Sequence, residues 1–330
     1  MKIRIKRAGL MTTIQDLGRF NYLSQGVPVS GAMDRLSAQI ANIALGNDPN
    51  DAVIEFTQSG ASFIIEEDAL ICLSGDGASL KAGVARLPSH RPLFVPSGTP
   101  IYLENLALGY RTYLAVAGGW DVPEVLGSKS TYLTAKIGGL NGRSLKENNI
   151  LKSTGKFTIA ATTIWDAVKS DSINYPKWSI ARNLFLPANR KIIRVVRSRE
   201  FEWFDKPSTD NFLSFQYTLG HNSNRMGYQL RGPILKRAVE GELLSTAVAP
   251  GTIQVTHNGE LVLLMADCQT TGGYPRIAQV LAVDLPLCAQ LTPGDVINFK
   301  EIDWRQAEKL YIEQQAELRK LACTIEQLYT

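Results

Sequence analysis

Several uncharged polar side chains gather where one apolar run of the sequence ends. The run Leu261–Met265 predicts a strand, and the polar segment Asp267–Pro275 follows it. Amide and hydroxyl groups on a rigid strand end suit the recognition of an amide, a lactam or a ureido group, and glycines let a ligand approach the backbone. The alternative is a tight loop whose Thr and Gln side chains bond to their own backbone. The candidate catalytic residues are Asp267, Gln269 and Tyr274, and the candidate binding residues nearby are Gln254, Thr270, Thr271, Gly272 and Gly273.

A second candidate segment, Asn222–Leu230, contains one arginine and one tyrosine. The guanidinium of Arg225 offers paired donors for a substrate carboxylate, and Tyr228 offers a hydroxyl. The alternative is a turn followed by a strand, with Arg225 exposed to solvent. Arg225 and Tyr228 are therefore candidate substrate-binding residues.

A third candidate lies near the start of the chain, in Thr12–Arg19 and Gly26–Asp34. Glycines and a proline shape these loops. Ser30 is expected to cap the helix that follows, and a helix start offers free N–H groups to a carboxylate or phosphate. The alternative is a loop held to its helix by an Asp16–Arg19 pair and an ordinary cap. The candidate binding residues here are Gln15, Asp16, Arg19, Ser30 and Asp34.

Other kinds of catalytic or metal site do not match the sequence. The segment Leu126–Thr131 contains Gly, Lys, Ser and Thr, but its spacing departs from the phosphate-binding loop GxxxxGK[ST]. The chain has no GxSxG, HExxH or dinucleotide-binding signature. Its four cysteines form no CxxC and its three histidines do not cluster with them, so we expect no metal site. Any acid–base chemistry would fall to Asp, Glu, Tyr or a bound water.

The elements that must position these residues are mostly short strands. Apolar runs bounded by Gly, Pro, Asn, Asp or Ser predict strands at Ala61–Ile65, Ala69–Leu73, Tyr113–Val116, Ile192–Val196 and Val280–Val283. Charged and apolar residues alternate from Lys2 to Lys6, which predicts a half-exposed strand. The strands do not alternate regularly with helices. A doubly wound parallel sheet therefore fits poorly, and a closed or nearly closed barrel fits better.

Two helices are predicted among these strands. The first covers roughly residues 32–45, where Met33, Leu36, Ile40 and Ile43 recur at three- and four-residue steps. The second covers about residues 303–328, and its apolar stripe is expected to dock on the parent domain or on a partner. The polar stretch 170–190 between them indicates a domain boundary.

The composition is that of an ordinary globular protein. The chain has 330 residues, 45% hydrophobic and 20% charged, which favours two domains. Its net charge of +4 is spread along the sequence, so we do not expect nucleic-acid binding. The sequence shows no signal peptide and no run long enough to span a membrane, so a soluble, cytoplasmic protein is expected.

Taken in order, these segments resemble the KipA family, also known as allophanate hydrolase subunit 2, of the biotin-dependent carboxyltransferases. The resemblance runs from about Gly9 to Phe299. Each motif is weak alone, but their order is specific. The motifs are Thr13–Arg19, Gly26–Asp34, Arg111–Gly119, Gly127–Thr131, Arg225–Tyr228, Gly251–Gln254 and Gln269–Pro275.

The resemblance implies a mainly β fold with some α-helix, of the cyclophilin-like β-barrel type and built from two subdomains. A carboxyltransferase-like subdomain A would cover residues 1–188. A cyclophilin-like barrel, subdomain B, would cover residues 189–302, and a C-terminal helix would cover residues 303–330.

The resemblance also implies an activity. Stand-alone members act as the C subunit of ATP-dependent 5-oxoprolinase, which opens 5-oxo-L-proline to L-glutamate. They work together with the A and B subunits of that enzyme, of which B is KipI-like (allophanate hydrolase subunit 1). ATP would act at the level of that complex. One alternative is biotin-dependent carboxyl transfer to urea or a related amide, with biotin as the cofactor. Another is regulatory binding of a KipI-like kinase inhibitor.

Two positions close to Arg225 depart from the family pattern. Asn224 stands where an acidic residue is usual, and Gln229 stands where a second arginine is usual. The two changes remove an acid and a base together, which either conserves the local charge balance or alters the choice of ligand.

Overall fold

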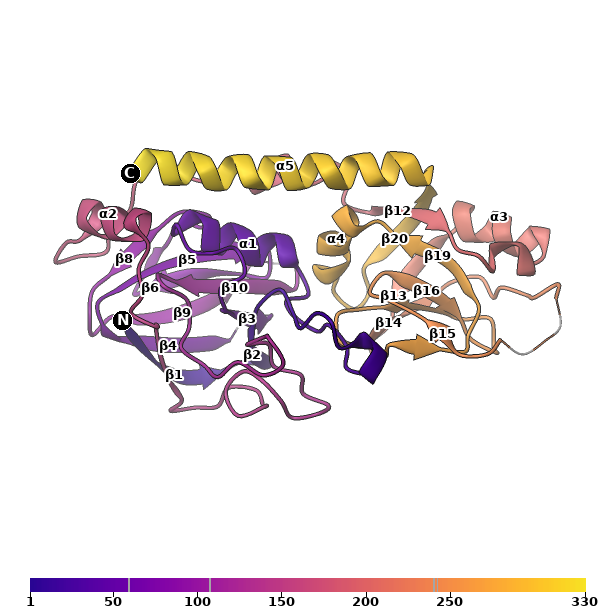
Figure 1. Ribbon diagram of the computed structural model, residues 1–330, viewed down its shortest axis with the longest axis horizontal. Helices are drawn as coiled ribbons and strands as arrows, with labels where there is room; N and C mark the ends of the chain where they lie inside the picture. The colour runs from indigo at the N-terminus through magenta and orange to yellow at the C-terminus, as the bar shows by residue number, and fades with distance from the viewer. Residues whose placement is uncertain (59, 107, 240, 242) are drawn as a thin grey trace. The chain divides into compact units, whose positions relative to one another are not determined.

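The computed structural model describes residues 1–58, 60–106, 108–239, 241 and 243–330 (Figure 1). It divides into two compact units, each assembled from separate parts of the sequence. The first unit comprises Met1–Arg19, Asp34–Leu184 and Ala316–Thr330, and the second comprises Phe20–Met33 and Phe185–Gln315. The sequential division at residues 188 and 302 stays a prediction, because compact units defined by contacts need not follow the chain.

Two antiparallel sheets form the framework of the first unit (Figure 1). One contains β1 (Lys2–Ala8), β4 (Ala61–Glu67), β6 (Ala78–Ala82), β7 (Ala85–Arg86), β9 (Pro100–Asn105) and β11 (Ile150–Lys152), in the order β11-β1-β4-β9-β6-β7. The other contains β2 (Met11–Gln15), β3 (Val53–Thr57), β5 (Ala69–Gly75), β8 (Leu93–Val95) and β10 (Arg111–Val116), in the order β2-β3-β10-β5-β8.

The burial of these strands follows their sequence patterns. In β1, Ile3 and Ile5 are buried while Lys2 and Arg4 are half-buried, as the alternation predicts. By contrast, β3, β5 and β10 are buried along their whole length. Helix α1 (Arg35–Ala44) packs on β5 and β10, and apolar residues of both sheets form one core. Strands covered on both faces explain the continuous apolar runs, and each large aliphatic side chain buried there contributes about 1.5–3 kcal/mol.

The start of α1 corrects one expectation from the sequence. The cap is Asp34, whose Oδ1 accepts a hydrogen bond from the backbone N–H of Ser37 at 2.9 Å. Ser30 lies four residues before that cap, with a positive φ of 57°. The prediction that Ser30 caps the helix is therefore wrong, because the Asp34 carboxylate satisfies the first free N–H groups.

A closed barrel forms the centre of the second unit. Its strands are β12 (Ile192–Arg197), β13 (Gln216–Leu219), β14 (Gly227–Arg231), β16 (Thr252–Val255), β17 (Leu261–Leu264), β19 (Arg276–Val280) and β20 (Val296–Glu301), in the order β12-β19-β16-β17-β14-β13-β20. The parallel pair β12–β20 closes the ring. Outside it, β15 (Thr246–Ala247) pairs with β18 (Thr271–Gly272). This arrangement confirms the mainly β fold with a closed barrel.

The remaining helices complete the two units. They are α2 (Ile159–Val168), α3 (Lys206–Ser214), α4 (Leu285–Ala289), α5 (Trp304–Tyr329) and the short 3-10 helices η1 (Leu23–Gln25), η2 (Arg182–Phe185), η3 (Phe201–Trp203) and η4 (Ala282–Asp284). Helix α5 confirms the predicted C-terminal helix, and Leu318 and Ile325 of its apolar stripe are buried. The strand predicted at Val280–Val283 is wrong beyond Val280, because the chain turns there into η4 and the Pro-containing α4.

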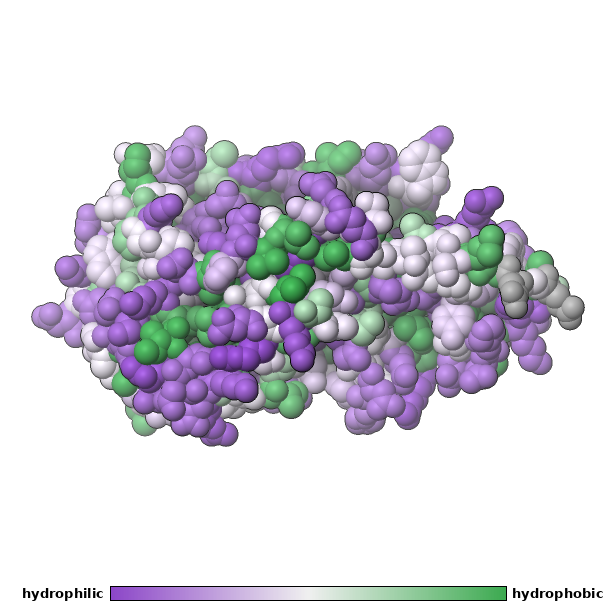
Figure 2. Space-filling model, turned by 60° about the horizontal axis from the view of Figure 1, so that its bottom comes forward, coloured by the Kyte–Doolittle hydropathy of each residue, from purple (hydrophilic) through white to green (hydrophobic). Residues whose placement is uncertain are grey.

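The described surface is mixed in character. On the face drawn in Figure 2, apolar residues lie in separate patches among hydrophilic ones. None of the helices in the described residues combines the length and the apolar character needed to cross a membrane.

Candidate functional site

The first polar cluster joins the end of β2 to a distant segment of the same unit. The Asp16 carboxylate accepts hydrogen bonds from the N–H groups of Gly18 (2.8 Å) and Lys129 (2.6 Å). It also accepts from the hydroxyls of Ser128 (2.7 Å) and Ser130. Asp16 is only 4% exposed, so the protein itself solvates this charge. Asp16 together with residues 126–131 is called the Asp16 loop below.

Gln15 and Arg19 bind the same loop. Gln15 Nε2 donates to the Thr131 carbonyl at 3.1 Å, and Arg19 Nη2 donates to the Ser130 carbonyl. The backbone and hydroxyl donors of this loop are thus bonded to an anion of its own chain. These donors are therefore used within the fold.

A glycine-rich segment packs against the Asp16 loop. A Cβ at Gly138 would lie 1.9 Å from the Ser130 carbonyl oxygen, and a Cβ at Gly139 would lie 1.9 Å from Thr131 Oγ1. Both glycines have a positive φ, 68° and 52°. Glycine is therefore required at both positions for close packing.

Asp34 lies in a second buried network of the first unit. Its Oδ2 accepts from Arg182 Nη2 at 2.6 Å and from the Ser37 hydroxyl at 2.5 Å. Arg182 Nη1 donates to Asp76 Oδ2 at 2.6 Å. Burial opposes the charge of Arg182, but Asp34 and Asp76 outweigh it and raise the pKa of the guanidinium. Arg182 is thus a buried cation held between two carboxylates.

The same network continues to the neighbouring strands β3 and β10 of the second sheet. The backbone N–H of Asp34 donates to the Tyr113 hydroxyl at 2.8 Å, and this hydroxyl donates to Glu55 Oε2 at 2.8 Å. Arg111 Nε lies 3.7 Å from Glu55 Oε1. Burial, followed by the charges of Glu55 and Asp34, raises the pKa of Tyr113 well above its usual range. Tyr113 is therefore a neutral phenol that orders the start of α1.

His90 lies in the field of these charges. Its φ is 58°, and its Nε2 is buried with no hydrogen-bond partner among the described residues. Burial, followed by the positive charge of Arg182, lowers the pKa of His90 to about 4. The imidazole is therefore neutral at pH 7.

The sequence did not single out Arg182, Asp76, Glu55 or His90. Their partners lie far away in the sequence, so no local spacing marks them. Arg111 and Tyr113 did carry a signal, because both belong to the motif Arg111–Gly119.

In the second unit, Arg225 and Asp267 form a buried ion pair. Arg225 Nε lies 2.7 Å from Asp267 Oδ2, and Nη2 lies 3.0 Å from Oδ1. Arg225 is 4% exposed, so the alternative of an exposed arginine is wrong. The backbone adds a bond from the Asp267 N–H to the Arg225 carbonyl at 2.9 Å, which fixes the ends of β14 and β17 to each other.

This ion pair also holds residues 20–33 of the second unit. The Ser30 hydroxyl donates to Asp267 Oδ1 at 2.6 Å, and Arg225 Nη2 donates to the Gly31 carbonyl at 2.6 Å. Ser30 and Gly31 have positive φ values of 57° and 85°. The ion pair therefore stabilises a strained backbone, which costs of order 1–3 kcal/mol at a non-glycine residue.

A third group, the glutamine corner, comprises Gln254 and residues 269–274. Gln254 is 1% exposed, and its Nε2 donates to the Tyr274 carbonyl at 3.2 Å. Gln269 Nε2 makes a long contact of 3.5 Å with Gln254 Oε1. A Cβ at Gly272 would lie 2.6 Å from Gln254 Nε2, so glycine is needed for this approach.

The glutamine corner presents polar groups to solvent from a fixed backbone. Gln269 and Thr271 are exposed, and Tyr274 is 38% exposed. The backbone is held by the pair Thr271–Ala247 and by the Val248 N–H, which donates to the Thr270 carbonyl at 3.0 Å. Tyr274 packs edge-on against His257, with ring centroids 5.2 Å apart. Exposed amide and hydroxyl groups on such a frame can form hydrogen bonds with a C=O and an adjacent N–H.

The candidate residues thus fall into separate networks. Gln15, Asp16 and Arg19 share the Asp16 loop, whereas Asp34 belongs to the Arg182 network. Ser30, Arg225 and Asp267 form the ion-pair cluster, and Tyr228 is a buried residue of β14. The described residues contain no group of three or more His, Cys, Asp or Glu that could hold a metal ion.

Comparisons with known proteins place the chain among carboxyltransferase domains. Residues 25–301 match the family described as carboxyltransferase domain, subdomain A and B. The chain is 38% identical to the 5-oxoprolinase C subunit of Escherichia coli over 320 residues, covering 97% of each chain. It is 34% identical to the 5-oxoprolinase C subunit of Haemophilus influenzae, covering 90% of each.

A second group of relatives is much longer. Urea amidolyase of Saccharomyces cerevisiae is 30% identical over 97% of this chain, but the match covers 18% of that protein. The crystal structure of K. lactis urea amidolyase superposes with a TM-score of 0.86 and 28% identity, covering 97% of this chain and 20% of the other.

Proposed function

This chain belongs to the family of carboxyltransferase domains with subdomains A and B, and from that membership we propose that it is the C subunit of an ATP-dependent 5-oxoprolinase. Together with the A and B subunits of that enzyme, it would open the lactam of 5-oxo-L-proline to give L-glutamate. Opening of the lactam would be coupled to hydrolysis of ATP by the complex as a whole. We further propose a cytoplasmic location and no activity for the isolated chain.

One observation carries this proposal. The similarity to the 5-oxoprolinase C subunit of Escherichia coli extends over 97% of both chains, so the two proteins correspond from end to end. The urea amidolyase relative, by contrast, is matched over only 18% of its length. The higher identity and the coverage of nearly the whole relative therefore favour the function of the 5-oxoprolinase C subunit over that of urea amidolyase.

The glutamine corner supplies the proposed contacts with the substrate. A lactam presents a C=O beside an N–H, and a primary amide offers both a donor and an acceptor to that edge. Gln269 would bind the lactam amide directly, and Gln254 would fix the orientation of Gln269. Thr270, Thr271 and the backbone at Gly272 and Gly273 would provide further hydrogen bonds, and the Tyr274 hydroxyl would serve proton transfer.

The ion-pair cluster supports a different role. Arg225 and Asp267 were candidates for substrate carboxylate binding and for catalysis, but each is bonded to the other and to the segment Ser30–Gly31. We propose that the pair positions this strained segment. Gln15, Asp16, Arg19 and Asp34 would likewise act by ordering loops, and Tyr228 by packing in β14.

Reconstitution tests the proposed function. The chain is mixed with its partner subunits, 5-oxo-L-proline and ATP, and the release of glutamate is measured with each component omitted in turn. Glutamate formed only by the complete mixture is the expected result. No glutamate from a complex whose assembly is verified by size-exclusion chromatography would reject the proposal.

Carboxyl transfer is the second candidate, because the chain superposes on urea amidolyase with a TM-score of 0.86. The ureido ring of biotin and urea both present a C=O beside an N–H, so the glutamine corner fits them as well. Under this alternative, activity toward urea would require a biotinylated carrier protein and bicarbonate. Activity that survives treatment with avidin would exclude it.

A further inference from the structure

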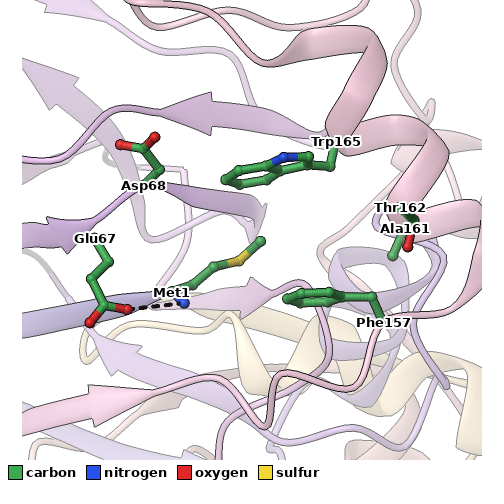
Figure 3. Close-up of a pocket in the computed structure, with 7 residues that line it drawn as sticks. All are labelled: Met1, Glu67, Asp68, Phe157, Ala161, Thr162 and Trp165. Atoms are coloured by element: carbon green, nitrogen blue, oxygen red, sulfur yellow. Dashed lines mark ion pairs between the residues drawn. The ribbon is translucent and has the colours of Figure 1, made fainter.

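The first unit contains a pocket whose lining includes none of the candidate residues above. It has a volume of about 430 Å³ and is lined by Met1, Glu67, Asp68, Phe157, Ala161, Thr162 and Trp165 (Figure 3). Three of these residues belong to α2, and the two acidic residues lie at the turn between β4 and β5. Pockets of 300–1,000 Å³ are typical for small organic ligands.

Two aromatic rings form apolar walls of the pocket. In Figure 3 the Met1 side chain runs between the ring of Trp165 and the ring of Phe157. Trp165 packs edge-on against Phe94, with ring centroids 5.1 Å apart. A Cβ at Gly118 would lie 3.2 Å from the Phe157 ring, so this ring rests directly on glycine backbone. Both rings are therefore held in place before any ligand binds.

The helix that carries Trp165 is also fixed. The Thr158 hydroxyl accepts from the Ala161 N–H at 3.0 Å and donates to the Gly46 carbonyl at 2.8 Å. A Cβ at Gly46 would lie 2.8 Å from the Ala160 Cβ, which shows how closely α2 approaches the chain there. The pocket is thus a preorganised feature of the fold, and preorganisation lowers the cost of binding.

The charged side chains of the pocket are acidic. Asp68 Oδ1 accepts a hydrogen bond from the backbone N–H of Ser97 at 2.8 Å, and this bond orients the Asp68 carboxylate. Glu67 Oε2 lies 3.4 Å from the backbone nitrogen of Met1. Figure 3 shows both carboxylates on the side of the pocket opposite α2. The Met1 amine is the cation beside Glu67, and Asp68 adds a second carboxylate on the same side of the pocket.

We propose that this pocket binds an organic cation, namely a protonated amine attached to an aromatic or branched aliphatic group. The apolar part would pack beside the Met1 side chain against Trp165 and Phe157, and the ammonium group would face Asp68. Aromatic faces attract cations: Lys169 Nζ already lies 5.9 Å from the centroid of the Trp165 ring. Anionic ligands are disfavoured by the two carboxylates, and neutral ones gain at most a hydrogen bond from them.

A matched pair of probes tests the charge requirement. Phenethylamine, protonated at pH 7, and 2-phenylethanol have nearly the same size and differ in the cationic group. Isothermal titration calorimetry with the full chain should give an affinity for phenethylamine about tenfold higher, which corresponds to about 1.4 kcal/mol. Raising the salt concentration should narrow this difference. Equal affinities, or no binding of either probe, would overturn the proposal.

Variants locate the binding site. Thr162→Lys puts a positive charge on the pocket wall from an exposed helix position, and it should reduce phenethylamine affinity at least tenfold. Thr163→Lys, next to it on α2 but outside the pocket lining, is the matched control and should bind as the wild type. Asp68→Asn keeps an acceptor for the Ser97 N–H and should reduce affinity about fivefold.

Thermal unfolding of each variant checks the fold before binding is compared. Equal losses in Thr162→Lys and Thr163→Lys, or unchanged binding in Asp68→Asn, would place the site elsewhere. Since binding is measured on the chain alone, the result is independent of whether the complex releases glutamate.

Discussion

The Asp16 loop and the glutamine corner have similar compositions but opposite structural characters. Both combine Gly, Ser or Thr with a polar side chain at the end of a strand. In the Asp16 loop the polar groups are buried and bonded to one another, with Asp16 4% exposed. In the glutamine corner Gln254 is buried, but Gln269 and Thr271 are exposed and Tyr274 is 38% exposed.

The difference shows that polarity and glycine content do not by themselves indicate a binding site. A carboxylate surrounded by donors of its own chain stabilises a loop, because removing it would leave several buried N–H and O–H groups unsatisfied. An amide whose tip faces solvent on a fixed backbone remains available to a ligand. We therefore propose that the Asp16 loop stabilises the fold and that the glutamine corner binds the substrate.

The largest effect is expected for Asp16→Ala. The change leaves the donors of Gly18, Ser128, Lys129 and Ser130 without their acceptor, and it should lower the free energy of unfolding by about 4 kcal/mol. Urea unfolding followed by circular dichroism measures this. The exposed Asp121→Ala is the control and should change the value by no more than about 0.5 kcal/mol. A loss as small as that of the control would mean that Asp16 is not a structural anchor.

Two glycine variants test whether close packing stabilises the Asp16 loop. Gly138→Ala places a Cβ 1.9 Å from the Ser130 carbonyl oxygen and should cost about 3 kcal/mol of stability. Gly127→Ala has a similar φ of 70° but meets nothing within 4 Å, so it should cost only about 1 kcal/mol. Equal losses of stability in the two variants would show that the positive φ, and not the close packing, determines the effect of the added Cβ.

The buried polar network of the first unit should make stability depend on pH. The pKa of His90 is lowered to about 4 in the folded chain, against about 6.5 when unfolded. Between these values the unfolded chain binds a proton that the folded chain does not. The free energy of unfolding should therefore fall as the pH falls from 6.5 to 4, by up to about 3 kcal/mol, and level off below.

Unfolding curves across this pH range check the prediction. His90→Gln should flatten the dependence, while the exposed His221→Gln should keep the wild-type slope. An unchanged slope in His90→Gln would assign the acid sensitivity to other groups.

The smallest effect on stability is expected in the glutamine corner. Gln269→Ala removes an exposed side chain and should change the free energy of unfolding by no more than about 0.5 kcal/mol. In the reconstituted complex it should reduce kcat/KM about 10- to 100-fold, because a contact to the lactam is lost. Gln229→Ala, at an exposed position of β14, is the matched control for both measurements. Full activity in Gln269→Ala would remove the glutamine corner from the site.

Local patterns predicted a part of the secondary structure. Alternation in Lys2–Lys6 predicted the half-exposed β1, and unbroken apolar runs predicted the fully buried β5 and β10. The failure at Val280–Val283 has a local origin as well, because apolar residues suit a buried 3-10 helix as readily as a strand.

Partners of the buried charges could not be predicted in this way. Ser128 and Ser130 lie 112 and 114 residues from Asp16, and Asp267 lies 237 residues from Ser30. Nothing in the spacing of either segment encodes such a pairing. The cap of α1 shows the same limit on a smaller scale, since Ser30 suited a cap by type but bonds to Asp267 instead.

By itself the sequence determined several strands, the helices α1 and α5 and the ordered motifs by which the family is recognised, because periodicity and turn chemistry act over a few residues. Only the tertiary structure decided which polar groups are hydrogen-bonded within the fold and which remain available to a ligand. The reason is that distant segments of the sequence meet only in the folded chain. The tertiary structure buries Arg225 against Asp267, leaves Gln269 exposed, and forms the acidic aromatic pocket between α2 and the turn at Glu67–Asp68. Burial then sets the energy of each polar group, since an interaction that is weak in water becomes strong once water is excluded.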